Sequence, residues 1–194
     1  TTQQQAVFMS IAHNDKKAHK YLLHGITGSG KTVIYLHLLQ QTIKSGKSAL
    51  LLVPEIVLAE SMVKPIQRYF PQAVILHSGL SVATRLARWQ AILEGSSATP
   101  TIVVGTRSAL FAPIAKLGLI IIDEAHEPSY KQDSGIRYQT VDVAAQLCNL
   151  HQANLVLGSA TPSLVQYQLA KTGKLELLTL SSRHLDTALP NITY

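Results

Sequence analysis

The chain has 194 residues, 46% of them hydrophobic and 14% charged, which is the composition of a folded domain and excludes an intrinsically disordered protein. Its single cysteine, Cys148, excludes an internal disulfide framework and a cysteine-cluster zinc site, so we expect no zinc and a cytoplasmic location. The formal net charge is +6, and residues 61–120 hold six Lys or Arg residues against one acid, Glu94, which indicates either a polyanionic partner or an ordinary basic surface.

Short apolar runs alternate with longer stretches of helical periodicity. The runs predict strands at 21–24, 48–54, 73–77, 101–105, 117–123, 154–159 and 175–180, and the periodic stretches predict helices near 31–45, 57–69, 81–94, 140–151 and 163–172. Strands that are apolar on both faces and separated by helices are typical of a parallel sheet. We expect an α/β domain over residues 1–180, with a mostly parallel central sheet and helices on both faces, and a linker over 181–194. No apolar run reaches the roughly 18 residues of a membrane span, so no membrane partner is expected.

The first apolar run leads into a glycine-rich turn that is followed at once by a helical stretch. The turn fits the pattern G-x-x-x-x-G-K-[ST] and reads Gly25, Ile26, Thr27, Gly28, Ser29, Gly30, Lys31, Thr32. Glycines let successive main-chain N–H groups point at phosphate oxygens, and the helix adds its own free N–H groups and dipole. The pattern predicts that Lys31 contacts the β- and γ-phosphates of a nucleotide and that the Thr32 hydroxyl binds Mg²⁺. The alternative is a glycine-rich turn without a ligand.

A second apolar run ends at two adjacent carboxylates, Asp123 and Glu124, which His126 follows. Paired carboxylates at the end of a buried strand are costly unless a cation meets them, and Mg²⁺ carried by a nucleotide is such a cation. We assign Asp123 to Mg²⁺ and Glu124 to the attacking water as general base; the alternative is an exposed acidic loop. His126 is either structural or placed to contact the γ-phosphate. A histidine metal site is not expected, because the eight histidines lack ligand spacing.

A third strand end, in NLVLGSATPS, carries the small hydroxyl residues Ser159 and Thr161. Taken alone, Thr-Pro before a helical stretch indicates a helix N-cap. The order of P-loop, DEAH and SAT, each at a strand end, resembles the superfamily 2 helicases and translocases and implies a RecA-like P-loop NTPase fold. In that group the SAT segment links hydrolysis to strand separation, so the resemblance gives this coupling role to Ser159 and Thr161.

Longer stretches narrow the resemblance to the PriA-type replication-restart (primosomal) DNA helicases. The matching segments cover nearly the whole chain and are GITGSGKTVIYL, LLLVPEIVLA, LHSGLS, RLARW, VVGTRSALFAP, IIDEAHEPSYKQ, RYQTVDVA and LGSATPS. The most specific are GTRSALFAP and HEPSYKQ followed by RY, whereas RecG-like branch-migration helicases share only the outline. The resemblance implies that Gln4 reads the adenine of ATP, with Gln3 and Gln5 as alternatives.

The resemblance also implies two DNA-contacting loops at strand ends. The first contains Pro54 and Glu55, and the second contains Gly105, Thr106, Arg107 and Ser108. Small donors and an arginine at such positions hold phosphates of one strand, and contacts of this kind carry position rather than base sequence.

Residues 127–140 match an aromatic-rich loop that senses single-stranded DNA in this family. The expected contacts are base stacking on Tyr130 and Tyr138 and phosphate pairing with Lys131 and Arg137. Tyrosines in a loop are alternatively half-buried packing residues. Relatives often carry a tryptophan where Ile136 stands, so base stacking at that position is open.

By this resemblance the chain is the first motor lobe of an ATP-dependent 3′→5′ DNA helicase that restarts stalled replication forks, with ATP and Mg²⁺ as cofactors. The implied partners are single-stranded and forked DNA, the second helicase lobe and zinc module of an intact chain, and primosome and single-strand-binding proteins. An arginine finger from the second lobe completes such an active site. We therefore expect residues 1–194 alone to bind nucleotide weakly, hydrolyse it poorly and leave DNA unwound.

Three other functions are open at this level: an RNA-directed DEAH motor, a small-molecule P-loop kinase and a non-catalytic docking domain. GTRSALFAP argues against the first. The second requires substrate pockets and a lid where this chain has the SAT segment and the aromatic-rich loop. Retention of Lys31 and Glu124 argues against the third.

Overall fold

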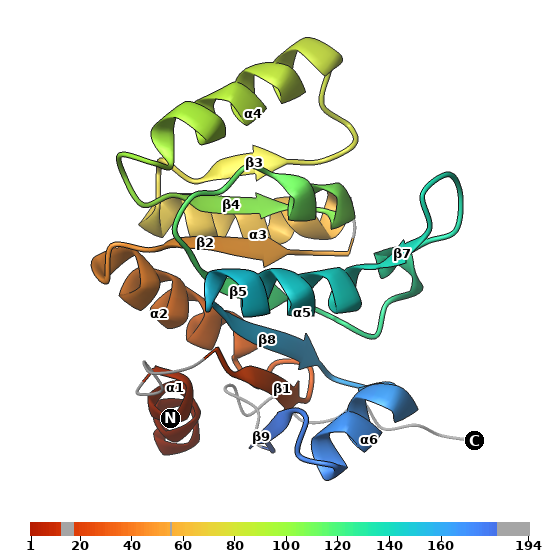
Figure 1. Cartoon of the computed structure of the whole chain (residues 1–194). Coiled ribbons are helices and arrows are strands. Elements are labelled where there is room, and N and C mark those ends of the chain that lie inside the picture. The colour runs from red at the N-terminus through yellow and green to blue at the C-terminus, as the bar shows by residue number, and fades with distance from the viewer. Residues whose placement is uncertain (13–17, 55, 182–194) are drawn as a thin grey trace, which may run out of the picture.

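The computed structural model describes residues 1–12, 18–54 and 56–181, and of residues 56–62 it describes the backbone only. Its centre is a seven-stranded sheet in the order β3-β4-β2-β5-β8-β1-β9, and all neighbouring strands in it are parallel (Figure 1). The strands are β1 (Lys20–Gly25), β2 (Ser48–Leu52), β3 (Val74–Leu76), β4 (Ile102–Gly105), β5 (Leu117–Ile122), β8 (Asn154–Ser159) and β9 (Glu176–Leu180). The predicted α/β class and parallel sheet are confirmed.

Helices cover both faces of this sheet. They are α1 (Thr2–Ala12), α2 (Lys31–Lys44), α3 (Ile56–Tyr69), α4 (Val82–Gly95), α5 (Thr140–His151) and α6 (Leu164–Lys171). Tyr21 and Leu23 of β1 pack in one apolar cluster with α1, α2 and α3, whereas Leu22 packs in a second cluster with α4 and α5. This alternation explains why the strand sequences are apolar throughout, since a strand covered on both faces needs apolar residues at every position. In Figure 1, α3 lies behind the sheet and α5 in front of it.

Some elements were not predicted from the sequence. These are α1, the short 3₁₀ helices η1 (Arg107–Phe111) and η2 (Pro128–Tyr130), and a small antiparallel hairpin of β6 (Lys131–Gln132) and β7 (Tyr138–Gln139). The predicted strands and helices lie where expected, with small differences at their ends. The predicted linker, Ser181 apart, lies outside the described residues. In the part of the chain that is described, no helix is both long and apolar enough to span a bilayer.

The sheet order brings three loops together. The glycine-rich turn follows β1, the paired carboxylates follow β5, and the SAT segment follows β8, which lies between β5 and β1. Because these strands are parallel, their carboxyl ends lie at one edge of the sheet, which is where ligands bind in folds of this type.

Gly105 ends β4 at a point where the chain passes very close to β3. A Cβ at this position would overlap the carbonyl oxygen of Leu76 and lie 2.5 Å from the Cβ of Ala109. We expect Gly105→Ala to lower the free energy of unfolding by about 1–3 kcal/mol, measured by urea denaturation. The matched control is Gly95→Ala at the end of α4, where a Cβ meets nothing within 4 Å and we expect no loss of stability, or a gain of up to about 1 kcal/mol. Equal losses in the two variants would contradict this explanation.

Candidate active site

The glycine-rich turn after β1 is shaped by backbone angles and by close packing. Gly28 and Gly30 have φ angles of 81° and 86°, in the left-handed region that favours glycine. A Cβ on Gly25 would lie 2.7 Å from the Ser29 Oγ. That hydroxyl is buried and, among the described residues, has no hydrogen-bond partner, while Thr27 is exposed. An unpaired buried hydroxyl in a glycine turn at a helix N-terminus fits a phosphate group.

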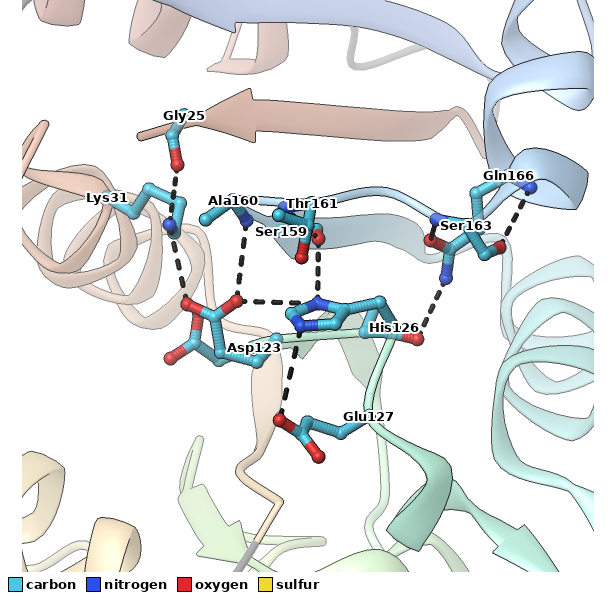
Figure 2. A network of polar contacts seen from close by, with 12 residues as sticks. Gly25, Lys31, Asp123, His126, Glu127, Ser159, Ala160, Thr161, Ser163 and Gln166 are labelled. Atoms are coloured by element: carbon cyan, nitrogen blue, oxygen red, sulfur yellow. Dashed lines mark hydrogen bonds and ion pairs between the residues drawn. The ribbon is translucent and has the colours of Figure 1, made fainter. Parts of the chain in front are cut away.

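Lys31 connects this turn to the paired carboxylates. Its Nζ atom donates to the carbonyl oxygen of Gly25 (Figure 2), at 2.8 Å. The same Nζ atom lies 3.5 Å from the Glu124 Oε1. The glycine-rich turn and the loop of paired carboxylates, which must lie close together to bind one nucleotide, therefore meet within ion-pair distance. Thr32 is half-buried in the first turn of α2.

Asp123 is held from several sides directly after β5. Its N–H donates to the carbonyl oxygen of Leu52 at 2.9 Å, and its own carbonyl oxygen accepts from the Tyr130 hydroxyl at 2.8 Å. Its Oδ1 accepts from the hydroxyl of Tyr35 at 2.9 Å. Burial raises the pKa of Asp123, whereas the hydrogen bond from Tyr35 and the ammonium of Lys31 act to lower it. Burial and the neighbouring Asp123 raise the pKa of Tyr35 well above its ordinary value, so this hydroxyl stays a donor.

Glu124 points to a different set of groups from Asp123. Its φ of 44° lies in the left-handed region, which is uncommon for a residue other than glycine and marks a sharp turn at the strand end. One carboxylate oxygen faces Lys31, and the other accepts from the N–H of Ala160 at 3.4 Å and lies 3.5 Å from the His126 Nδ1. Glu124 thus lies between the glycine-rich turn and the SAT segment.

His126 pairs with the SAT segment. Its Nδ1 and the Ser159 Oγ share a hydrogen bond of 2.8 Å, and the same hydroxyl accepts from the N–H of Thr161 at 3.0 Å (Figure 2). Its Nε2 lies 4.0 Å from the Glu127 Oε1. These contacts join the DEAH residues directly to the two hydroxyl residues predicted to couple them. A γ-phosphate contact for His126 stays a prediction.

A buried glutamine that the sequence analysis missed supports this loop. Gln166 donates from Nε2 to the carbonyl oxygen of Ala125 at 2.8 Å, while the N–H of Ala125 donates to the carbonyl oxygen of Gly158. Gln166 also forms a capping box with Ser163 at the start of α6. The spacing S-x-x-Q before a helix was the available signal, although it predicts only the cap and not the contact with Ala125.

Gln4, one of the three N-terminal glutamines, is hydrogen-bonded to the glycine-rich turn. Its Nε2 donates to the carbonyl oxygen of Ser29 at 2.9 Å. Gln3 instead donates to the carbonyl oxygen of Thr179, and Gln5 is exposed. A hollow of about 490 Å³ beside the turn is lined by residues that include Gln4, Gln5, Phe8, Val33, Ile34 and His37. Adenine recognition by Gln4 stays a prediction.

The predicted DNA-contacting residues after β2 and β4 differ in exposure. Pro54 is buried, and Glu55 lies outside the described residues. Thr106 is half-buried, and Ser108 is exposed in η1 at the same edge of the sheet as the other loops. Their contacts with phosphates stay predictions.

Arg107, in η1 after β4, is hydrogen-bonded to the aromatic-rich loop. Its guanidinium donates to the carbonyl oxygens of Ser129, at 3.0 Å, and of Lys131. Lys131, Arg137 and Ile136 are exposed, and the Lys131 ammonium lies 2.8 Å from the exposed carboxylate of Asp133 in the same loop. Arg107 has a structural role in this conformation that the sequence did not indicate.

Base stacking on Tyr130 is contradicted by the structure. Its side chain is 3% exposed, its hydroxyl donates to Asp123, and its carbonyl oxygen accepts from the Thr140 Oγ1 at 2.7 Å. The ring is a packing residue that supports the end of β5, because a buried phenol needs a hydrogen-bond partner and finds one there. Tyr138 is half-buried, with its ring edge-on to Phe111 at 5.1 Å between centroids.

The residues present fit Mg²⁺ bound through a nucleotide. Thr32 and Asp123 supply a hydroxyl and a carboxylate, which are oxygen ligands of the kind that Mg²⁺ takes, and Mg²⁺ usually needs few protein ligands beside phosphate oxygens. Among the described residues, no three His, Cys, Asp or Glu side chains gather in a way that would hold a metal ion by themselves.

Comparison with known proteins identifies a matching helicase family and relatives that share 43% and 48% of their aligned residues with this chain. The family model described as DEAD/DEAH box helicase matches residues 1–169. The chain is 43% identical to the replication restart protein PriA of Bacillus subtilis (strain 168) over 196 aligned positions, which is 100% of this chain and 24% of the relative. It is 48% identical to the protein of the same name from Chlamydia pneumoniae, over 85% of this chain and 22% of that one. The chain thus spans about a quarter of the length of these relatives.

Solved structures share the fold at lower identity. A structure of RecG bound to a three-way DNA junction gives a TM-score of 0.69 with 21% identity, and it covers 96% of this chain and 24% of that one. The Pyrococcus furiosus Hef helicase domain gives a TM-score of 0.64 with 21% identity, over 92% of this chain and 37% of that one. These likenesses agree with the RecA-like fold that the sequence implied.

Gln166 offers a test of how the DEAH loop is held. Gln166→Ala leaves the carbonyl oxygen of Ala125 without its side-chain donor and also removes the capping-box bond from the Ser163 N–H, and we expect the free energy of unfolding to fall by about 1–3 kcal/mol in urea denaturation. Gln168→Ala is the matched control, because Gln168 is exposed on the same helix and its loss leaves no buried group unpaired. A loss no larger than that of the control would show that the contact with Ala125 contributes little.

Proposed function

Because this chain belongs to the DEAD/DEAH box helicase family, we propose that it is the ATP-binding motor lobe of a DNA-dependent ATPase and 3′→5′ DNA helicase that acts in replication restart. The observation that carries the proposal is the approach of Lys31 to Glu124, which brings a phosphate-binding turn and a pair of carboxylates to one place. Relatives named as replication restart proteins, at 43% and 48% identity, support the choice of process.

The glycine-rich turn binds the phosphates in this proposal. Main-chain N–H groups of the turn, the Ser29 hydroxyl and the Lys31 ammonium hold phosphate oxygens. Thr32 and Asp123 hold Mg²⁺, which when bound neutralises charge on the phosphates. Gln4 binds adenine in the adjoining hollow.

Glu124 becomes the general base when Lys31 changes partners. Lys31 exchanges Gly25 and Glu124 for phosphate oxygens, and this leaves the Glu124 carboxylate free to take a proton from water. The second carboxylate oxygen of Glu124 already lies beside Ala160 of the SAT segment and beside His126. When Lys31 leaves Glu124, the charge around this carboxylate changes, and the SAT segment is in direct contact with it. Ser159 and Thr161 thereby couple hydrolysis to movement of the lobe.

The proposal includes the partners that such a motor needs. They are single-stranded and forked DNA, a second helicase lobe and a zinc module in the intact chain, and primosome and single-strand-binding proteins, all in the cytoplasm. Residues 1–180 form the lobe and 181–194 lead out of it. A RecG-like branch-migration motor is the alternative; the likeness to RecG, at 21% identity, supports the shared fold and does not favour that function.

Glu124 and Lys31 separate the chemical step from binding. In the intact protein we expect Glu124→Gln to lower the DNA-stimulated ATPase kcat by about 10²-fold or more while ATP still binds, because the base is lost and the turn is intact. Lys31→Ala should abolish both. Glu176→Gln, which changes an exposed carboxylate on β9, is the control and should leave the rate unchanged. Unchanged kcat in Glu124→Gln would remove Glu124 as the base.

The nucleic-acid partner and the need for a second lobe are tested together. We expect the ATPase of the intact protein to be stimulated by single-stranded DNA more than by RNA of the same length. Residues 1–194 alone should hydrolyse ATP poorly and displace no strand from a forked duplex, since an arginine finger contributes about 10³–10⁵ in rate in related enzymes. Strand displacement by residues 1–194, or stimulation by RNA alone, would overturn this part of the proposal.

A further inference from the structure

Tyr35 reaches the site from inside the core. It lies on α2 one turn after Lys31 and is 1% exposed, and its ring belongs to the apolar cluster on that face of the sheet. Its hydroxyl donates to the Asp123 Oδ1 at 2.9 Å. The contact thus comes to Asp123 from the buried side, and neither the motif patterns nor the proposed mechanism uses it.

The phenol occupies space that exists because residue 158 is glycine. A Cβ on Gly158 would overlap the Tyr35 hydroxyl, lie 3.0 Å from the Tyr35 Cζ and lie 3.4 Å from the Asp123 Oδ1. The backbone of Gly158 has no positive φ, so its lack of a side chain is not explained by backbone conformation. The glycine before the SAT residues is therefore explained by the ring of Tyr35.

These contacts leave Asp123 little freedom. Its main chain is fixed by hydrogen bonds with Leu52 and with the Tyr130 hydroxyl, and the Tyr35 hydroxyl takes one of its two carboxylate oxygens. A phenol is a neutral donor, so it orients the carboxylate without cancelling its charge, which a lysine in the same place would do. Such outer partners set the direction of metal-binding groups in other sites.

We infer that Tyr35 is a positioning residue that directs the Asp123 carboxylate towards Mg²⁺, and that Gly158 provides the space for it. The inference rests on the proposed function, because it takes Asp123 as the residue that holds Mg²⁺. Tyr35 itself contacts neither nucleotide nor metal in this assignment. Loss of its hydroxyl therefore changes the dependence on Mg²⁺ rather than the binding of phosphate.

The test uses Tyr35→Phe in the intact protein, a change that removes one oxygen atom and keeps the ring. The Mg²⁺ concentration that half-saturates the ATPase should rise about 10–100-fold, and kcat at saturating Mg²⁺ should change much less. Binding of a fluorescent, non-hydrolysable ATP analogue supplies a readout apart from turnover. Its affinity in EDTA should be unchanged within about twofold, and the gain in affinity on adding Mg²⁺ should shrink. Tyr69→Phe, at an exposed tyrosine on α3, is the matched control.

Asp123→Asn separates failure of the inference from failure of the proposed function. If Asp123→Asn abolishes the Mg²⁺-dependent gain in affinity and Tyr35→Phe leaves it intact, then Tyr35 has no positioning role. If Asp123→Asn also leaves the gain intact, the assignment of Asp123 to Mg²⁺ in the proposed function is wrong. Reduced affinity in EDTA for Tyr35→Phe would point to a general loss of structure and would overturn the positioning role.

A second measurement tests the packing without any ligand. Gly158→Ala should lower the urea midpoint of the wild-type protein, because the new methyl group overlaps the Tyr35 hydroxyl. In the Tyr35→Phe background the overlap with oxygen is gone, so the same substitution should lower the midpoint less. Equal shifts in the two backgrounds would contradict the explanation given for Gly158.

Discussion

The site depends on the single strand, β8, that separates its two halves. β8 lies between β5 and β1, so the carboxylates and the glycine-rich turn are separated by two strand spacings, or roughly 10 Å. Two side chains from α2 cross that gap: Lys31 reaches Glu124, and Tyr35 reaches Asp123. Tyr35 crosses beside Gly158 of β8, where a Cβ would overlap its hydroxyl. The parallel order of the sheet and the missing side chain together allow a single helix to hold both carboxylates.

Main-chain atoms of the DEAH loop are fixed as firmly as its side chains. The N–H of Ala125 donates a hydrogen bond to Gly158 in β8, and its carbonyl oxygen accepts one from Gln166 in α6. The N–H of Asp123 donates to Leu52 in β2. Glu124, between them, has the left-handed backbone angle. An uncommon conformation at one residue persists when its neighbours are held on both sides, and this arrangement provides that support. Glu124 is therefore an irregular point in a loop whose neighbouring residues are hydrogen-bonded to the sheet and to α6.

The sequence predicted the features that depend on residues close together in the chain. Apolar runs and glycine spacing depend on residues that are near one another in the chain, so the strands, the turn and the paired carboxylates were found at their correct places. Helix α1 was missed because its buried face includes Gln4 beside Val7, Ile11 and Ala12, and a glutamine on that face interrupts the apolar periodicity. Tyr130 was assigned to DNA by resemblance to an aromatic-rich loop, and the sequence of a loop does not show whether an aromatic ring faces solvent or the core. Tyr35 shares a helix face with Lys31 by spacing, but nothing local shows that Asp123 lies opposite.

Gly158 and Tyr35 belong to segments that are distant in the chain, yet each limits what the other position accepts. A side chain at position 158 costs less once the phenol oxygen of Tyr35 has gone, and a phenol at position 35 fits best when residue 158 has no side chain. The stability effect of a substitution at either position therefore depends on which residue occupies the other, although the two lie far apart in the chain.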